Sequence, residues 1–160
     1  MHKLNQRYIN NIVRKALNED LKPKGDITTN LISFKNKKSK AIIIAKQNGI
    51  IAGLDLCKSA FKLIGKETIF INKVKEGAKI KKNKVIAEII AKTKTILIAE
   101  RTALNFLNHT SGIATFTNKL TEKVNKKTKI CCTRKTTPNL RLLEKYAVKK
   151  GGGHNHRFNL

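Results

Sequence analysis

The sequence predicts an α+β domain followed by the beginning of a parallel α/β unit. In the first ninety-odd residues, short β-type runs alternate with turn signals, which is typical of an antiparallel sheet. A long helical segment then leads to a short apolar run, a loop, a second helix and a triple glycine. That order is typical of parallel strands joined through a helix.

The first element is predicted to be an amphipathic helix over residues 3–18. Its apolar side chains recur at helical spacing and are Leu4, Tyr8, Ile12, Val13, Ala16 and Leu17. Pro23 and Gly25 are expected to break the chain after this helix. Asp26 together with Thr28 can cap the turn that follows.

The next segments predict the sheet and a helix beside it. Residues 40–46 resemble a buried strand, and residues 53–64 a helix that Gly65 terminates. Residues 67–74 are strand-like. Residues 74–97 contain short β runs, separated by turns at Glu76-Gly77 and Lys82-Asn83.

A second helical region is predicted over residues 99–124. Its apolar side carries Ala103, Leu104 and Leu107, and we expect an interruption at Ser111-Gly112.

The C-terminal part predicts one β-loop-α unit. Residues 129–133 suit a buried parallel strand, and residues 137–150 a helix. Thr137 is expected at the N-cap of this helix and Pro138 at its first position. Gly151-Gly152-Gly153 is expected to end the helix before a further strand.

The formal net charge is +25, which raises the possibility of a nucleic-acid-binding module. However, 29 of the 35 basic residues are lysines scattered along the chain, and Ile and Asn are also abundant. These three residue types have AT-rich codons, so biased base composition explains the excess without a polyanionic partner. We therefore expect no nucleic-acid partner, and the basic module remains the alternative.

The three cysteines, Cys57, Cys131 and Cys132, have no metal-binding or CxxC spacing. Their odd number, without a signal sequence, suggests a reducing cytoplasm. Cys131 and Cys132 are expected to pack in the predicted strand. The longest apolar runs are too short to span a bilayer, so no membrane association is expected.

Two basic clusters are the candidate binding site. Arg134-Lys135, with Thr136, follows the predicted strand at 129–133, where parallel α/β proteins collect ligand-binding residues. His156-Arg157 follows the triple glycine. Together they predict a pocket for a small molecule with several negative charges. The alternative is that both are solvated surface segments. Glu100-Arg101 can be a local ion pair, and we expect His109 to be structural.

Several segments, in order, resemble the quinolinate phosphoribosyltransferase family, also called nicotinate-nucleotide pyrophosphorylase (carboxylating). The most specific are ERTALNFL…SGIAT and TRKTTP…LEKYAV…GGG…NHR, and further ones are EDLKPKGDITT, GIIAGLDLC and VKEGAKIKKNKVIAEI. The resemblance implies an α/β sandwich domain, residues 1–110, and the start of an incomplete α/β barrel, residues 111–160.

The resemblance also implies an activity. Members of the family transfer phosphoribose from phosphoribosyl pyrophosphate to quinolinate with Mg²⁺, yielding nicotinate mononucleotide, pyrophosphate and CO₂ in NAD biosynthesis. By motif position, Arg134, His156 and Arg157 would hold the quinolinate carboxylates. Lys135, with Thr136, would lie near substrate phosphate or carboxylate. Arg101 would reach the active site of the other subunit of a homodimer. No residue is assigned as catalytic.

The chain departs from the family pattern at three points. Many relatives carry Asp in place of Cys132 and Gly in place of Asn139. A barrel needs roughly 200 residues, and the family's later phosphoribose and Mg²⁺ ligands are missing, so we assign no metal ligand. We therefore interpret the sequence as the N-terminal part of such an enzyme and expect the 160-residue chain alone to be inactive. A related transferase with another substrate remains a further alternative.

Overall fold

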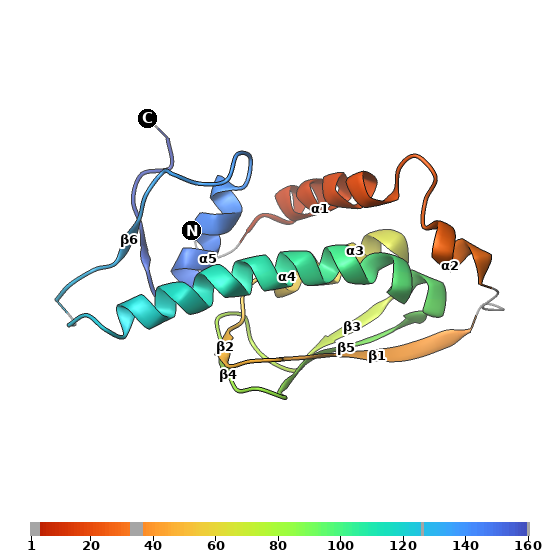
Figure 1. Cartoon of the computed structure of the whole chain (residues 1–160), viewed down its shortest axis with the longest axis horizontal. Helices are drawn as coiled ribbons and strands as arrows, with labels where there is room; N and C mark the ends of the chain where they lie inside the picture. The colour runs from red at the N-terminus through yellow and green to blue at the C-terminus, as the bar shows by residue number, and fades with distance from the viewer. Residues whose placement is uncertain (1–3, 33–36, 126, 160) are drawn as a thin grey trace.

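The computed structural model describes residues 4–32, 37–125 and 127–159. A 29-residue helix, α4 (Thr93–Thr121), runs along most of the molecule (Figure 1). An antiparallel sheet lies along the first half of α4, and a small parallel β-α-β unit packs beside its second half. Helix α4 therefore connects the two structural parts that the sequence predicts.

Helix α1 (Gln6–Leu21) confirms the predicted N-terminal helix, although it ends three residues later. Asn5 caps it, because its side chain accepts a hydrogen bond from the N–H of Arg7 at 2.7 Å. The side chains it buries are Ile9, Val13 and Leu17. Ile9 was missing from the predicted apolar stripe, whereas Tyr8, Ile12 and Ala16 are half-buried at its edges.

A short helix, α2 (Ile27–Leu31), follows, and Asp26 is its N-cap as predicted. The predicted partner Thr28 is wrong: the Asp26 carboxylate accepts hydrogen bonds from the N–H and the hydroxyl of Thr29, at 2.9 and 2.5 Å. These two bonds lower the pKa of Asp26.

The main sheet has the antiparallel order β1-β5-β3, built from β1 (Lys38–Ile44), β5 (Val85–Lys92) and β3 (Ile69–Asn72). The strand predicted over 40–46 is confirmed as β1, but its predicted burial is wrong. Strand β1 lies at the edge of the sheet and buries Ile43, while Ile42 is 49% exposed on the opposite face. An apolar run does not reveal that one face of its sheet has no covering layer.

Helix α3 (Leu54–Ile64) ends at Gly65 as predicted and packs against the sheet, with the rings of Phe61 and Phe70 6.0 Å apart. The chain enters α3 from a two-stranded ladder, β2 (Gly49–Ile50) with β4 (Lys79–Ile80). Glu76 accepts hydrogen bonds from the N–H groups of Gly53, at 2.5 Å, and Leu54, at 3.0 Å. Its carboxylate thereby satisfies N–H groups at the start of the helix.

Helix α4 begins at Thr93, so the β-type prediction for the end of 74–97 is wrong there, and no interruption occurs at Ser111-Gly112. Hydroxyl groups on α4 bind the main chain around β2 instead. Ser111 Oγ accepts from the N–H of Ala52 at 3.0 Å, and Thr115 Oγ1 accepts from the N–H of Ile50 at 2.9 Å. The hydroxyls therefore dock the strand on α4 without breaking the helix.

The C-terminal unit consists of β6 (Cys131–Cys132), α5 (Arg141–Lys150) and β7 (His154–Asn155), and the glycines end α5 as predicted. The predicted start of the helix is wrong. Asn139 adopts a φ of 65°, outside the helical region, so α5 begins at Arg141. Thr137 is not the N-cap; its main-chain N–H donates to Glu144 Oε2 at 3.2 Å.

Helix α4 continues through residue 110, so the division into 1–110 and 111–160 passes through one helix. Tyr146 of α5 also contacts the first part. Burial, followed by the neighbouring Glu76 carboxylate, raises the pKa of Tyr146 above its usual range. In the described part of the chain, no helix is both long and apolar enough to cross a membrane.

Candidate anion-binding site

The two basic clusters lie at one edge of the parallel pair formed by β6 and β7. Cys131 is opposite His154, and Cys132 is opposite Asn155. Because the strands run in the same direction, their carboxyl ends meet at the same edge. Arg134-Lys135 leaves one strand and His156-Arg157 leaves the other, so residues about twenty positions apart become neighbours.

The prediction that β6 is buried is wrong, although its parallel pairing is confirmed. Cys131 is exposed and Cys132 is half-buried. Strand β6 is two residues long and pairs with β7 within the described structure, which leaves much of it uncovered.

Arg134 carries a buried donor without an acceptor. Its Nε atom is buried and has no hydrogen-bond partner among the described residues. A buried guanidinium nitrogen without an acceptor is costly, so the described residues do not fully satisfy this guanidinium group. Lys135, His156 and Arg157 are exposed beside it.

Arg141 was not among the predicted site residues, yet it connects the two loops. Its Nε donates to Thr136 Oγ1 at 3.2 Å, and its Nη1 donates to the carbonyl oxygen of Phe158, also at 3.2 Å. The hydroxyl of Thr136, a predicted ligand group, is therefore engaged within the protein. The sequence signal for Arg141 was its guanidinium group, which can bond two partners at once.

Lys145 was also missed, although its side chain is fully buried. Its Nζ atom lies 2.9 Å from Cys132 Sγ and 3.3 Å from the carbonyl oxygen of His156. The ring of Phe158 covers it, with the centroid 5.1 Å away. No pattern in the sequence could have indicated this position, because lysine is almost always exposed.

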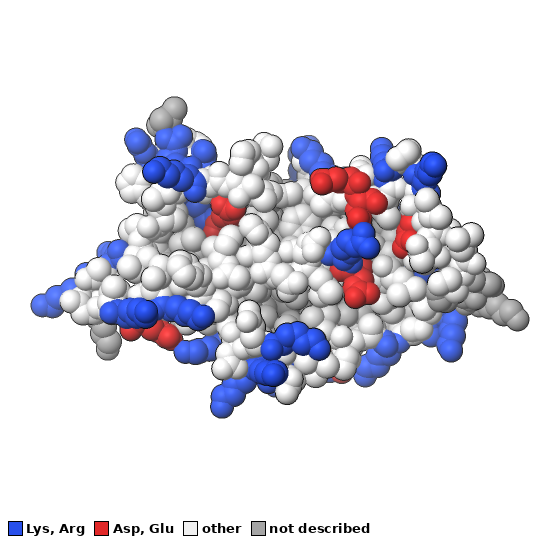
Figure 2. Space-filling view, viewed as in Figure 1, with Lys and Arg blue, Asp and Glu red and all other residues white. Residues whose placement is uncertain are grey.

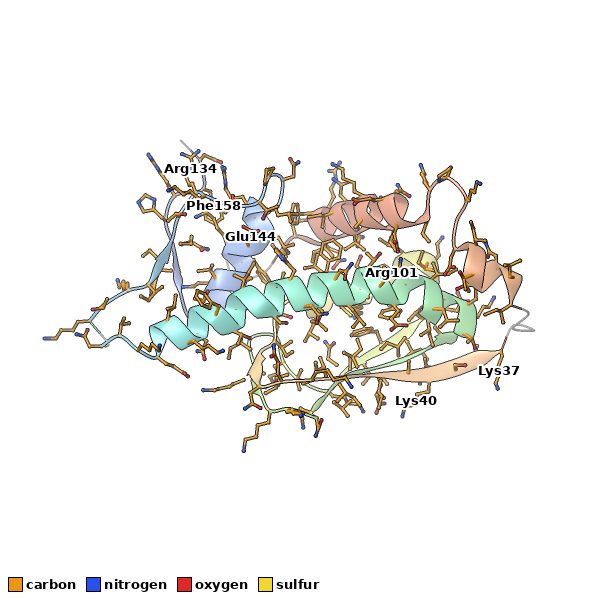
Figure 3. The ribbon with its side chains drawn as sticks, in the orientation of Figure 1. Lys37, Lys40, Arg101, Arg134, Glu144 and Phe158 are labelled. Carbon is orange, nitrogen blue, oxygen red and sulfur yellow. The ribbon has the colours of Figure 1, made fainter. Side chains whose placement is uncertain are left out.

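Arg101 is not part of this cluster. It lies in the first half of α4, whereas Arg134, Phe158 and Glu144 lie together at the other end of the molecule (Figure 3). The Arg101 side chain is 76% exposed, and its Nη1 lies 3.3 Å from Asp20 Oδ1. Its predicted role in a partner subunit stays a prediction.

Glu144 is the only acidic residue after Glu122 in the sequence. Besides Thr137, it contacts His109, whose Nε2 lies 3.4 Å from Glu144 Oε1. This carboxylate therefore ties α4, α5 and the Arg134 loop together. In residues 4–32, 37–125 and 127–159, no three His, Cys, Asp or Glu side chains form a group that could hold a metal ion.

Positive charge on the face shown in Figure 2 is dispersed. Lys and Arg side chains lie mostly around its rim, and acidic side chains occur in several places, most of them right of centre with a basic side chain among them. The described surface on this face has no single basic patch of the kind that a nucleic acid requires. The fold and the site define an α/β protein in which two cationic loops follow a pair of parallel strands.

The chain belongs to the quinolinate phosphoribosyl transferase family. The family's N-terminal domain matches residues 26–111, and its C-terminal domain matches residues 113–160.

Relatives of known sequence agree with this assignment. Two proteins named "probable nicotinate-nucleotide pyrophosphorylase (carboxylating)" are each 44% identical to it. The one from Bacillus subtilis aligns over 85% of this chain and 47% of its own length, and the one from Methanocaldococcus jannaschii over 96% and 53%. The chain therefore spans about half the length of these curated relatives.

Solved structures show the same fold. The crystal structure of NadC from Streptococcus pyogenes superimposes with a TM-score of 0.94 at 42% identity, covering 98% of this chain and 57% of that chain. The nicotinate-nucleotide pyrophosphorylase from Francisella tularensis superimposes with a TM-score of 0.93 at 37% identity. This match covers 99% of this chain and 57% of that chain. The described part of this chain thus matches the N-terminal domain and the start of the barrel domain.

Proposed function

We propose that this chain supplies the carboxylate-binding part of an enzyme that transfers phosphoribose from phosphoribosyl pyrophosphate to the ring nitrogen of quinolinate. The products are nicotinate mononucleotide, pyrophosphate and CO₂. The observation that carries the proposal is the meeting of Arg134-Lys135 and His156-Arg157 at one strand edge. Buried Arg134 Nε, which lacks an acceptor among the described residues, supports it.

Each predicted site residue has a proposed role. Arg134, His156 and Arg157 bind the two carboxylates of quinolinate. Lys135, with Thr136 beside it, lies near substrate phosphate or carboxylate. Each charge-assisted contact is worth roughly 1.5–3 kcal/mol. The cationic loops would also stabilise the charge that develops as pyrophosphate leaves and as the carboxylate is lost.

No nucleophile and base pair is needed for this chemistry, because the ring nitrogen itself attacks the sugar carbon. The work of the chain's residues is to orient a dianion and to balance its charge. Arg101 lies apart from this cluster, which agrees with a role in the second active site of a homodimer. The proposed units are residues 1–110 and 111–160, and the proposed location is the cytoplasm, in line with three free cysteines.

The family's Mg²⁺ finds no protein ligands in the described part of this chain. The chain has one acidic residue after Glu122, which is Glu144. The Glu144 carboxylate already accepts a hydrogen bond from the N–H of Thr137 and contacts His109. The described residues therefore do not fit a metal site, and no step of the proposal passes through one.

Calorimetric titration of the purified chain with quinolinate tests the proposal. We expect binding that exceeds that of nicotinate, which has one carboxylate. Arg134→Lys should weaken quinolinate binding at least about tenfold, equivalent to about 1.4 kcal/mol, because ammonium cannot make a two-point contact. Arg14→Lys, on the exposed side of α1, is the matched control and should have no effect.

Two results would contradict the proposal. One is equal affinity for quinolinate and nicotinate, or no binding of either. The other is steeply salt-dependent binding of duplex DNA without any competition by quinolinate, which would favour the nucleic-acid alternative.

A further inference from the structure

Two cationic side chains of α5 hold the same short segment of the chain. Arg141 and Lys145 are four residues apart, so they lie on the same side of the helix, one turn from each other. Arg141 binds the carbonyl oxygen of Phe158, and Lys145 binds the carbonyl oxygen of His156. Their two contacts therefore bracket Arg157.

Each of these side chains also reaches the first basic loop or its strand. Arg141 Nε donates to Thr136 Oγ1 at 3.2 Å, and Lys145 Nζ lies 2.9 Å from Cys132 Sγ. The segments that carry Arg134-Lys135 and His156-Arg157 are thus joined through α5 as well as through the β6-β7 ladder.

The environment of Lys145 is unusual for a structural lysine. Its side chain has no exposed surface, and none of the ion pairs formed by the described residues includes it. Its neighbours are a thiol, a carbonyl oxygen and an aromatic ring. A charge buried without a counter-charge is costly, and an apolar side chain of similar volume is commonly tolerated in its place.

We propose that Arg141 and Lys145 are positioning residues that clamp His156–Phe158 against the Arg134 loop, and that the unbalanced charge of Lys145 adds to the attraction for a bound dianion. The clamp sets the distance between the two basic clusters, so a ligand finds its donors already in place. The link to a dianion rests on the proposed function, whereas the clamp itself rests on the contacts.

Hydrogen–deuterium exchange and quinolinate titration of the same samples test the two parts separately. Lys145→Met removes the charge with little change in volume. We expect its melting temperature to be unchanged or raised, while the amides of residues 156–158 exchange at least about tenfold faster and quinolinate binds at least about tenfold more weakly. A merely structural lysine would not separate stability from affinity in this way.

Two further variants complete the design. Lys149→Met, one turn further along α5 and half-buried, removes the same charge from a side chain for which the described residues show no hydrogen bond to the segment. It should match wild type in exchange and affinity. Arg141→Met should also speed exchange at 156–158. In the double variant Arg141→Met with Lys145→Met, the decrease in the opening free energy measured by exchange at 156–158 should be smaller than the sum of the two single effects, because both side chains hold one segment.

Unchanged exchange at 156–158 in Lys145→Met, or equal effects of Lys149→Met, would overturn the clamp. If Lys145→Met speeds exchange at 156–158 but the wild-type chain does not bind quinolinate, the clamp is supported and the proposed ligand is wrong.

Discussion

Gly151, at the end of α5, lies so close to the backbone of α4 that a β-carbon on it would overlap the main-chain carbonyl oxygen of Ala114. Any side chain at Gly151 would overlap this carbonyl and Thr117. This contact positions α5, and with it the β6-β7 pair, on the second half of α4.

Gly151→Ala should therefore destabilise the protein. Relieving the overlap requires a shift of one backbone against another, which we expect to lower the free energy of unfolding by about 1–3 kcal/mol. Urea denaturation followed by circular dichroism measures this. Gly112→Ala is the control, because a β-carbon there meets no atom of the described residues within 4 Å. In the middle of α4 it should raise stability by up to about 1 kcal/mol, and destabilisation of the same size by both variants would contradict this explanation.

The hydroxyl of Thr110 should contribute measurably to the attachment of α4 to the chain near β2. It is fully buried and donates to the carbonyl oxygen of Ala52, which Ser111 Oγ also approaches at 3.1 Å. Thr110→Val keeps the shape and removes the donor, which should cost about 1–2 kcal/mol in unfolding free energy. Adding Ser111→Ala should cost more in this background than in wild type, because Ala52 then loses both donors. Strict additivity in the urea-denaturation cycle would argue against the shared acceptor.

Cys57 should resist alkylation in the folded chain. Burial raises the pKa of the Cys57 thiol to about 12, and the thiolate is the reactive form. At pH 8, iodoacetamide should modify exposed Cys131 at least about a hundredfold faster than Cys57, as followed by peptide mass spectrometry. In concentrated urea the two should react alike. Comparable rates in the native protein would show that the core opens readily.

Glu88 should make stability depend on pH. Hydrogen bonds from Lys73, at 3.2 Å, and Lys40, at 3.3 Å, lower its pKa. A carboxyl group with a lower pKa in the folded state stabilises that state above its unfolded pKa, and the contribution is lost as pH falls through the folded pKa. Glu88→Gln should therefore lower the urea midpoint at pH 7, and its difference from wild type should shrink as the pH falls below the usual carboxyl range.

Glu19→Gln, on the exposed side of α1, is the control for the Glu88 experiment and should show little difference at either pH. A constant gap between Glu88→Gln and wild type from pH 7 down to pH 3 would show that the two lysines do not stabilise the carboxylate.

The sequence predicted much of the local structure because hydrophobic periodicity and turn residues act over a few positions. Helix α3 with its stop at Gly65, strand β3 and the glycine end of α5 follow this rule. The errors have another cause. The end of 74–97 looked like a strand because its apolar β-branched residues fit either structure, and packing against α1, α3 and the sheet makes residues from Thr93 onward helical.

The site divides in the same way. The positions of Arg134-Lys135 and His156-Arg157 after two strands could be predicted, because residue types and expected strands are local facts. The burial of Lys145 and the bridge made by Arg141 could not, because both depend on which segments α5 meets in space.

By itself, the sequence determined the family, the order of most elements and the positive charge of the two loops, since each is encoded in neighbouring residues. Only the tertiary structure decided that a lysine lies buried under the second loop and that Arg101 and Arg134 lie toward opposite ends of the molecule. The physical reason is that burial and distance are set by contacts between segments remote in sequence, and short-range patterns carry no record of those contacts.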